Sequence, residues 1–471
     1  MGSMDIGVIG LAVMGQNLAL NIESRGYTVA VYNRTEARTR AFIESQSKSK
    51  AIEAAYDIES FVALLSRPRK VLLMVKSGAA TDALIEALLP LLEPGDILMD
   101  GGNAHYSDTD RRYAAAERLG LHYLGIGISG GETGALLGPA IMVGGSLSGY
   151  EQVAPLLESL AAVGPHGSCC ALLGPRSAGH YVKMIHNGIE YALMQALCEA
   201  YDLMHRGLEM SADEMADVFG RWNDAELESY LVAITEKILR QQDPEGTGPL
   251  VEMILDTAAQ KGTGKWSSQS ALDLGTPSAS IAAAVFARIT SSLKAERSAA
   301  EMLLAGPHPR LSMRRDEALD ALFSTLLLAF LTVYGQGFRQ LQDASQDRAY
   351  ALDLSEVARV WMAGCIIRAR LLVPMGKAFA RQPDLAYLLL AEPFQSLWNK
   401  HQASFRSMVA CAHEAGIPVP AMSSALNFVD TYRTARLPAN LLQAQRDYFG
   451  AHTYQRIDRD GIEHTNWEQV R

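Results

Sequence analysis

The pattern of apolar and polar positions divides the chain into two regions. From residue 4 to about residue 178, short apolar runs alternate with segments of helical period. The runs that predict strands are residues 5–10, 28–32, 71–75, 96–99 and 121–124. Because short strands alternate with helices, we expect residues 1–178 to form a doubly wound α/β domain around a parallel sheet.

Beyond residue 179 the strand signal disappears, and long helical patterns dominate to about residue 440. A proline-free stretch at 179–206 predicts one long helix. The longest apolar run, 321–334, is too short to span a bilayer and predicts a buried core helix, so we expect no membrane insertion. A large all-α domain at 179–440 is therefore expected, followed by a C-terminal tail at 441–471 that would fray unless it docks on something.

The long predicted helix carries a polar stripe made of Lys183, His186, Asn187, Glu190 and Tyr191. Residues three and four apart are neighbours on a helix, so these five share one face. A polar stripe on a mostly apolar helix is costly unless every group has a partner. A lysine and a glutamate two turns apart suggest an acid/base pair facing a ligand. On this segment alone, an internal salt-bridge network fits equally well.

A glycine-rich turn follows the first predicted strand and opens a helix, in the variant pattern G-x-A-x-x-G. The first glycine permits the tight turn, the small middle residue lets a pyrophosphate approach the backbone, and the last glycine lets helix and strand pack closely. The motif alone is weak, but its place in a strand–turn–helix unit predicts a Rossmann-like dinucleotide site. Its residues are Gly10, Leu11, Ala12, Val13, Met14 and Gly15.

The second predicted strand ends in Asn33, Arg34 and Thr35, where an NAD site normally has a carboxylate. Arg34 can pair with a 2′-phosphate, so NADP is favoured over NAD. In isolation a solvated turn arginine would be the ordinary interpretation. Two further strands end near polar groups, at the edge where open α/β sheets bind ligands, and Asn103 could reach both cofactor and substrate. These candidates are Val75, Lys76, Ser77 and Asn103.

Ser129, Gly130 and Gly131 follow the last of the predicted strands and offer hydroxyl and amide donors suited to a carboxylate. A plain glycine turn would look the same. Arg288 sits on a helix that is otherwise apolar and small, where an arginine is more often paired structurally than bound to a ligand.

A cationic loop contains Lys261, Thr263 and Lys265, a set apt for an anionic group. The loop superficially resembles a nucleotide-binding P-loop. That motif requires glycine where Ala259 stands, and serine or threonine where Trp266 stands, so we reject this interpretation.

Composition narrows the functional classes. The chain has 471 residues, enough for two or three domains, and a net charge of −10 without basic runs, which argues against nucleic-acid binding. Its five cysteines are odd in number and lack metal-ligand spacing, and no signal peptide is recognisable. We therefore expect a reducing, cytoplasmic setting and no metal site.

These features together resemble the 6-phosphogluconate dehydrogenase family, over about residues 5–467. The wider β-hydroxyacid dehydrogenase superfamily shares only the glycine turn, the Ser-Gly-Gly segment and the Lys/Asn helix. The segments that carry the resemblance are 10–18, 33–35, 183–191, 254–266, 438–454 and 464–467.

The resemblance implies NADP-dependent oxidative decarboxylation of 6-phosphogluconate to ribulose 5-phosphate, CO2 and NADPH. It makes residues 1–178 the NADP-binding domain and 179–440 the substrate and dimerisation domain of a homodimer with shared active sites. Lys183 would be the general base and Glu190 the general acid. The sugar acid's carboxylate and hydroxyls would be held by Asn103, Ser129, Gly130, Gly131, His186 and Asn187. Its phosphate would be surrounded by Tyr191, Lys261, Thr263, Arg288 and Arg446, with Arg446 and His452 coming from the partner's tail.

The chain departs from the family pattern at three places. Thr133 stands where a second glutamate usually follows Glu132, residues 140–145 read AIMVGG rather than SLMPGG, and Ser77 replaces an alanine. These departures bear on substrate affinity and loop geometry and leave the activity class intact.

Two other functions compete with this interpretation. An NADP-linked dehydrogenase of a small unphosphorylated hydroxyacid would not need Lys261, Arg288 or the tail cations. A catalytically inactive NADP-binding or scaffolding protein would have no use for the acid/base residues, yet Lys183 and Glu190 are both present.

Overall fold

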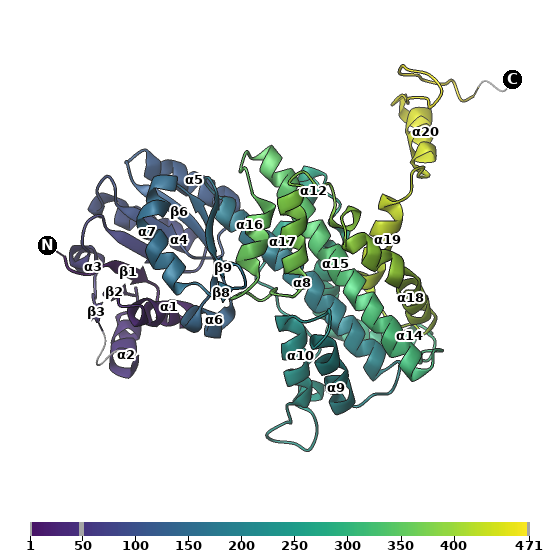
Figure 1. Cartoon of the computed structure of the whole chain (residues 1–471), viewed down its shortest axis with the longest axis horizontal. Coiled ribbons are helices and arrows are strands. Elements are labelled where there is room, and N and C mark those ends of the chain that lie inside the picture. The colour runs from purple at the N-terminus through teal and green to yellow at the C-terminus, as the bar shows by residue number, and fades with distance from the viewer. Residues whose placement is uncertain (1, 47–50, 469–471) are drawn as a thin grey trace. The chain divides into compact units, whose positions relative to one another are not determined.

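The computed structural model describes residues 2–46 and 51–468 of the chain (Figure 1). Its internal contacts define two units, Met1–Ala425 and Leu426–Arg471, which are described separately below. The division falls inside helix α19 (Pro420–Tyr432).

The first unit begins with an eight-stranded sheet in the order β10-β7-β6-β5-β4-β1-β2-β3. Its strands are β1 (Ile6–Ile9), β2 (Val29–Tyr32), β3 (Ile52–Ala54), β4 (Lys70–Leu73), β5 (Ile97–Asp100), β6 (His122–Ser129), β7 (Ala140–Gly145) and β10 (Cys170–Gly174). The short strands β8 (Val163–Gly164) and β9 (Gly167–Ser168) pair with each other. The expected Rossmann-like α/β domain is confirmed.

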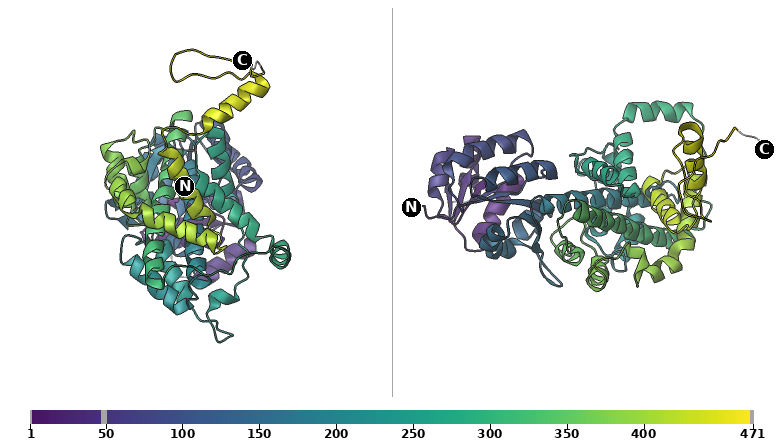
Figure 2. Two further views of the ribbon diagram at one scale, coloured as in Figure 1. Left: turned by 90° about the vertical axis from the view of Figure 1, so that its right-hand side faces the viewer. Right: turned by 90° about the horizontal axis from the view of Figure 1, so that it is seen from above.

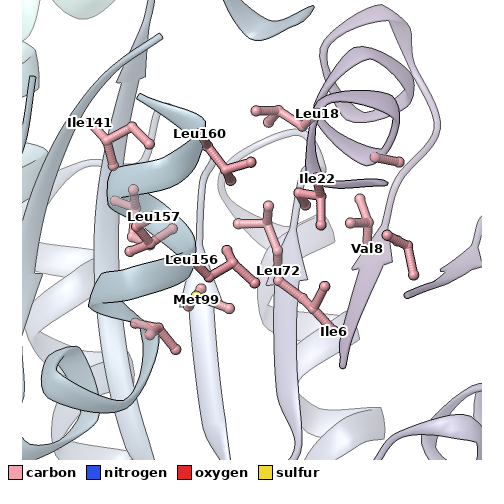
Figure 3. Packing of buried hydrophobic residues seen from close by; sticks show 14 of the residues in the cluster. Ile6, Val8, Leu18, Ile22, Leu72, Met99, Ile141, Leu156, Leu157 and Leu160 are labelled. Carbon is pink, nitrogen blue, oxygen red and sulfur yellow. The ribbon is translucent and has the colours of Figure 1, made fainter. Parts of the chain in front are cut away.

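Helices cover both faces of the sheet, because successive strand residues point to opposite sides. Ile6 and Val8 belong to one core cluster with Leu18 and Ile22 of α1 (Figure 3). Ile9 belongs to the cluster on the opposite face of the sheet. The connecting helices are α1 (Val13–Ser24), α2 (Glu36–Gln46), α3 (Ile58–Leu64), α4 (Ala79–Leu88), η1 (Leu89–Leu91), α5 (Tyr106–Glu117), α6 (Gly131–Leu137) and α7 (Leu147–Leu160).

The sheet is mixed rather than wholly parallel, which corrects the sequence-based expectation. Strand β7 runs antiparallel to β6, and the strands β3 and β7 were not among those predicted. A parallel return needs a crossover of a dozen or more residues, and the connection from β6 to β7 is shorter than that. The chain therefore doubles back along β6.

The helical part of this unit begins with α8 (Ala178–His205), which confirms the long helix predicted at 179–206. Helix α8 contacts strands β6 and β7 near its start and then extends into the helical region (Figure 2). Its companions are α9 (Ala212–Asn223), α10 (Tyr230–Arg240), α11 (Leu250–Met253), α12 (Thr263–Leu274), α13 (Ala279–Ser291), α14 (Lys294–Leu303), α15 (Arg315–Asp347), α16 (Leu354–Trp361), α17 (Leu372–Arg381), η2 (Leu388–Leu390) and α18 (Phe394–Glu414).

Helix α15 contains the apolar run predicted as a core helix, and it packs against α8 and α18. It is longer than the run itself, because polar residues on both sides continue the helix to 33 residues. Among the residues that the structure describes, it alone is long and apolar enough to cross a membrane, and 83% of its most apolar window is buried inside the protein.

The second unit contains α20 (Ala439–Gly450) and a loop that returns to it. Asp447 is buried there and accepts hydrogen bonds from the backbone amides of Thr453 and Thr465, at 2.9 and 3.1 Å. His464 Nδ1 and Trp467 Nε1 each lie 2.9 Å from the same carboxylate. The predicted tail thus begins inside a helix, and its last residues, 469–471, lie outside the described residues.

Candidate functional site

The glycine turn between β1 and α1 has the shape that its sequence predicted. Gly10 has a φ of 102°, and a Cβ atom at Gly15 would overlap the carbonyl oxygen of Gly10. The amide of Leu11 donates to Asn33 Oδ1 at 3.1 Å, which joins this turn to the end of β2. The N-cap residue Ala12 provides no side-chain cap, so the first amides of α1 can serve a bound anion.

The end of β2 presents a cation to solvent. Arg34 and Thr35 are exposed, and Asn33 Nδ2 donates to the Thr35 carbonyl at 3.2 Å. Within the described ranges Arg34 forms no ion pair, whereas nearby Arg40 pairs with Glu36. The structure therefore leaves Arg34 able to receive a phosphate.

The other candidate cofactor residues lie along the same sheet edge. Strand β1 pairs in parallel with β2 and β4, and β4 pairs in parallel with β5, so their carboxyl ends meet. The loop after β4 carries Val75, Lys76 and Ser77, and Lys76 is exposed. Asn103, in the loop after β5, is also exposed, and within the turn Val13 is 53% exposed while Met14 is half-buried.

The polar stripe on α8 converges around His186. Lys183 Nζ lies 3.4 Å from His186 Nδ1, which also lies 3.1 Å from Asn187 Oδ1 and 3.9 Å from Glu190 Oε2. On its other side, His186 Nε2 lies 3.1 Å from Ser129 Oγ, at the end of β6. The structure thus brings together the stripe and the Ser129 segment.

Burial sets the protonation of this cluster. It lowers the pKa of Lys183, against the opposing charge of Glu190, and it raises the pKa of Glu190, against Lys183. Burial and the charge of Lys183 hold the pKa of His186 well below its usual range. Lysine and glutamate are therefore both pushed toward their neutral forms, which is what a general base and a general acid require.

The alternative of an internal salt-bridge network finds little support. Lys183 forms no ion pair with a carboxylate in the part of the chain that the structure describes. The His186–Glu190 contact is long, and the low pKa of His186 keeps the ring neutral.

Strand β6 packs against the aliphatic stem of Lys183. A Cβ atom at Gly127 would overlap the Cβ of Lys183, so only glycine lets the strand pack against the lysine stem. Two residues later the strand ends at Ser129, followed by Gly130 and by Gly131, the first residue of α6.

A second cluster of candidate residues surrounds Tyr191, the residue after Glu190 on α8. The guanidinium carbon of Arg288 lies 3.7 Å from the ring centre of Tyr191. Among the residues that the structure describes, Arg288 has no carboxylate partner of the kind expected for a structural arginine. A Cβ atom at Gly264 would overlap the Tyr191 ring, so the start of α12, with buried Thr263, lies against it. Lys261 precedes this helix and is exposed.

The two tail candidates belong to the second unit and make local contacts there. Arg446 Nη1 donates to Gln443 Oε1 at 3.1 Å, and the His452 ring lies 6.0 Å from that of Phe449. Both side chains are exposed within the unit.

Sequence reasoning missed several residues around the site. Trp361 packs edge-on to His186 at 5.9 Å, and Cys365 is close enough to Lys183 to oppose the lowering of its pKa. Arg112 donates a hydrogen bond to Asp100, near the carboxyl ends of β4 and β5, which we call the cofactor edge. Trp361, Cys365 and Arg112 carry no motif, and only the fold brings them to these positions.

Comparison with known proteins agrees with this geometry. The NAD binding domain of 6-phosphogluconate dehydrogenase, as a family model, matches residues 5–174, and the model of the 6-phosphogluconate dehydrogenase C-terminal domain matches residues 179–467. The NADP(+)-dependent, decarboxylating 6-phosphogluconate dehydrogenase of Bacillus subtilis is 50% identical over 99% of this chain and 100% of its own length. The decarboxylating enzyme of Escherichia coli is 49% identical, with the same coverage.

A solved structure supports the same assignment. The 6-phosphogluconate dehydrogenase of Plasmodium falciparum, described in apo form, with its cofactor NADP+ and with its substrate 6-phosphogluconate, superposes with a TM-score of 0.95. It is 39% identical, and the match covers 98% of this chain and 100% of that protein. Since both family models match and the relatives align over almost their entire length, the chain belongs to the 6-phosphogluconate dehydrogenase family.

Proposed function

We propose that this protein catalyses the NADP-dependent oxidative decarboxylation of 6-phosphogluconate to ribulose 5-phosphate, CO2 and NADPH. The observation that carries the proposal is the buried stripe on α8, where Lys183 and Glu190 are both pushed toward neutrality. The names of the full-length relatives support the same overall reaction.

The cofactor edge fits NADP. The small residue Ala12 leaves room for a pyrophosphate, and Gly15 lets α1 pack against the turn, where a Cβ atom would overlap the Gly10 carbonyl oxygen. Arg34 is exposed and available for a 2′-phosphate. NADP, when bound, accepts a hydride from the substrate. The residues proposed to hold it are Gly10, Leu11, Ala12, Val13, Met14, Gly15, Asn33, Arg34, Thr35, Val75, Lys76, Ser77 and Asn103.

In the proposed mechanism, neutral Lys183 takes the proton of the C3 hydroxyl as C3 is oxidised. The resulting lysine ammonium polarises the C3 carbonyl, so that the carboxylate leaves as CO2 without a metal ion. Glu190 then gives a proton to C1 of the product enediol. The carboxylate and hydroxyls of the sugar acid are held by Asn103, Ser129, Gly130, Gly131, His186 and Asn187.

We further propose a phosphate site built from Tyr191, Lys261, Thr263 and Arg288, and completed by Arg446 of the partner subunit. His452 of the partner subunit is proposed as a further substrate contact. The support is a cation stacked on Tyr191 and a second cation, Lys261, ahead of α12. Both would be superfluous for an unphosphorylated hydroxyacid.

Exposed apolar side chains in the helical region support the proposal of a homodimer. Large apolar side chains lie open on α12, α13 and α14, including Leu272, Phe286 and Met302 at 82%, 67% and 87% exposed. Patches of this kind mark protein interfaces. We propose an NADP-binding domain at 1–178, a substrate and dimerisation domain at 179–440, and a tail at 441–471 that docks on the partner subunit.

A cytoplasmic location is part of the proposal. All five cysteines are free, which agrees with a reducing compartment.

The direct test is an assay of 6-phosphogluconate with NADP and with NAD, scoring both reduced cofactor and CO2. We expect both products, with NADP preferred. We expect Lys183→Ala to lower turnover by roughly a hundredfold or more, as removal of a general base does, while Lys377→Ala, on the exposed side of α17, stays active. Reduced cofactor without CO2 would refute the decarboxylation, and near-normal turnover by Lys183→Ala would refute the base.

A further inference from the structure

One buried guanidinium lies beneath the cofactor edge. Arg112 is on α5 and only 2% exposed. Its Nε donates to Asp82 Oδ1 at 2.8 Å, its Nη1 to Asp100 Oδ2 at 3.2 Å, and its Nη2 to the carbonyl oxygen of Gly78 at 3.1 Å. Every nitrogen of the guanidinium therefore has an acceptor.

The three acceptors belong to two separate segments, the start of α4 and the end of β5. Gly78 directly follows Ser77 and is the N-cap of α4, whose first turn contains Asp82. Asp100 is the last residue of β5, and its Oδ1 accepts a hydrogen bond from the amide of Gly102 at 3.0 Å, one residue before Asn103. Arg112 thus joins the loop after β4 to the loop after β5.

The chemistry of this junction is specific to arginine. Asp100 is buried as deeply as Arg112, and Tyr123 donates to the same carboxylate oxygen at 3.0 Å. The guanidinium is the first cause that lowers the pKa of Asp82. A lysine has one nitrogen and lacks the planar fork, so it cannot serve three acceptors that lie in different directions.

We propose that Arg112 is a positioning residue that holds the loops 75–78 and 101–103 in register and thereby sets the affinity for NADP. This inference rests on the proposed function insofar as those loops contact the cofactor. Arg112 itself is buried behind the loops and acts through Gly78 and Asp100.

The same strands supply a matched control at their opposite ends. Arg69 precedes β4 and Asp96 precedes β5, and they pair at 2.9 Å with side chains only 12% and 3% exposed. This pair ties together the amino ends of the two strands, away from the edge where ligands bind. Arg69→Lys alters a buried arginine–aspartate pair between the same two strands without touching either loop.

The experiment compares Arg112→Lys with Arg69→Lys in the full chain. Melting temperature measures the structural loss, and direct titration with NADP measures the dissociation constant. We expect both variants to melt earlier. Arg112→Lys should bind NADP about tenfold more weakly, as expected for the loss of a charge-assisted hydrogen bond, while Arg69→Lys should stay within about twofold of the unaltered protein, a difference below half a kcal/mol.

Equal dissociation constants for the two variants would overturn the proposal and make Arg112 a purely structural residue. Should Arg112→Lys fail to fold, Asp82→Asn weakens one of the three contacts at a half-buried position. It is expected to give a smaller loss of the same sign, and no change in its NADP affinity would refute the positioning role. Failure of the proposed function is seen separately, because the unaltered protein would then bind NADP but not turn over 6-phosphogluconate.

Discussion

Lys183 and Glu190 show how one cause can prepare two opposite chemical roles. Both side chains lie on α8, and burial is the largest influence on the pKa of each. Since burial penalises charge, it favours the neutral form of both side chains, the forms that the proposed base and the proposed acid require. Their mutual attraction opposes both shifts, so the site depends on the depth of burial rather than on the pairing.

This balance predicts the pH dependence of catalysis. As pH rises through the lowered pKa of Lys183, the base becomes neutral and kcat/KM should increase. Ionisation of Glu190, whose pKa is raised, removes the proton of the acid and should lower the rate on the alkaline side. We expect a bell-shaped profile, and Glu190→Gln should lack the alkaline limb because its side chain does not titrate. A Glu190→Gln profile that keeps an unchanged alkaline limb would contradict the assignment.

Arg34 is predicted to read the 2′-phosphate. Arg34→Glu should weaken NADP by at least about tenfold relative to NAD, because a charge-assisted contact is replaced by repulsion. Measuring kcat/KM for both cofactors gives this ratio. Arg40→Glu makes the same charge change where the arginine is already engaged with Glu36, and should leave the ratio nearly unchanged. Equal losses for both cofactors in Arg34→Glu would rule out the role.

At the scale of elements, the functional stripe depends on how closely α8 approaches β6. The strand has glycine at the point of contact, Gly127, so the lysine stem lies directly against the backbone. The packing of α8 on β6 therefore fixes the position of the Lys183 Cβ atom. That position limits which groups the Lys183 Nζ can reach.

Gly127→Ala should disturb this approach. The new methyl group overlaps Lys183 Cβ, so either the strand or the helix must move, at a cost of about 1–3 kcal/mol. We expect a lower melting temperature and a reduced kcat, with NADP affinity much less affected. Gly306→Ala, where the added carbon meets open space, is the control. Unchanged kcat in Gly127→Ala would show that the approach does not position the lysine.

The elements also show which features a sequence can reveal. Helix α8 was predictable because a proline-free amphipathic stretch leaves few alternatives, and the glycine turn because its spacing follows from local geometry. The direction of β7 depends on the connection from β6, which is too short for a crossover. The pattern of apolar residues carries no information on strand direction. Arg112 gave no signal, since its three acceptors come together only when β4 and β5 pair.

At the scale of the whole molecule, α8 also anchors the helix at which the two units divide. Glu199, near the end of α8, accepts hydrogen bonds from the amides of Ala421 and Met422 at 2.7 and 2.9 Å, in the first turn of α19. Burial raises the pKa of Glu199 from 4.5 to about 7, although these bonds and Gln195 oppose the shift. The helix that carries the polar stripe therefore also caps α19.

The raised pKa of Glu199 predicts how the free energy of unfolding changes with pH. Its folded pKa lies above the unfolded value, so its favourable contribution is complete below pH 4.5 and is lost as pH rises through about 7. The unfolding free energy should fall by something on the order of 3 kcal/mol across this window. The glutamine side chain in Glu199→Gln does not titrate, so this variant should lack that part of the pH dependence.

Denaturant unfolding at about pH 5 and about pH 8 measures the effect. Glu296→Gln, on the exposed helix α14, should keep the slope of the unaltered protein. A Glu199→Gln variant with that same slope would mean that the pH dependence arises elsewhere.

The buried Asp447 has a consequence for how the tail acquires its shape. All four of its hydrogen bonds close within 20 residues along the chain. Short loops close with little loss of chain entropy, and contacts that are local in sequence form early in folding. The tail can therefore order itself without waiting for the sheet or the long helices. In the proposed homodimer, a subunit with a preformed tail would bring a rigid segment to its partner, so assembly would carry little of the entropy cost of folding a disordered segment.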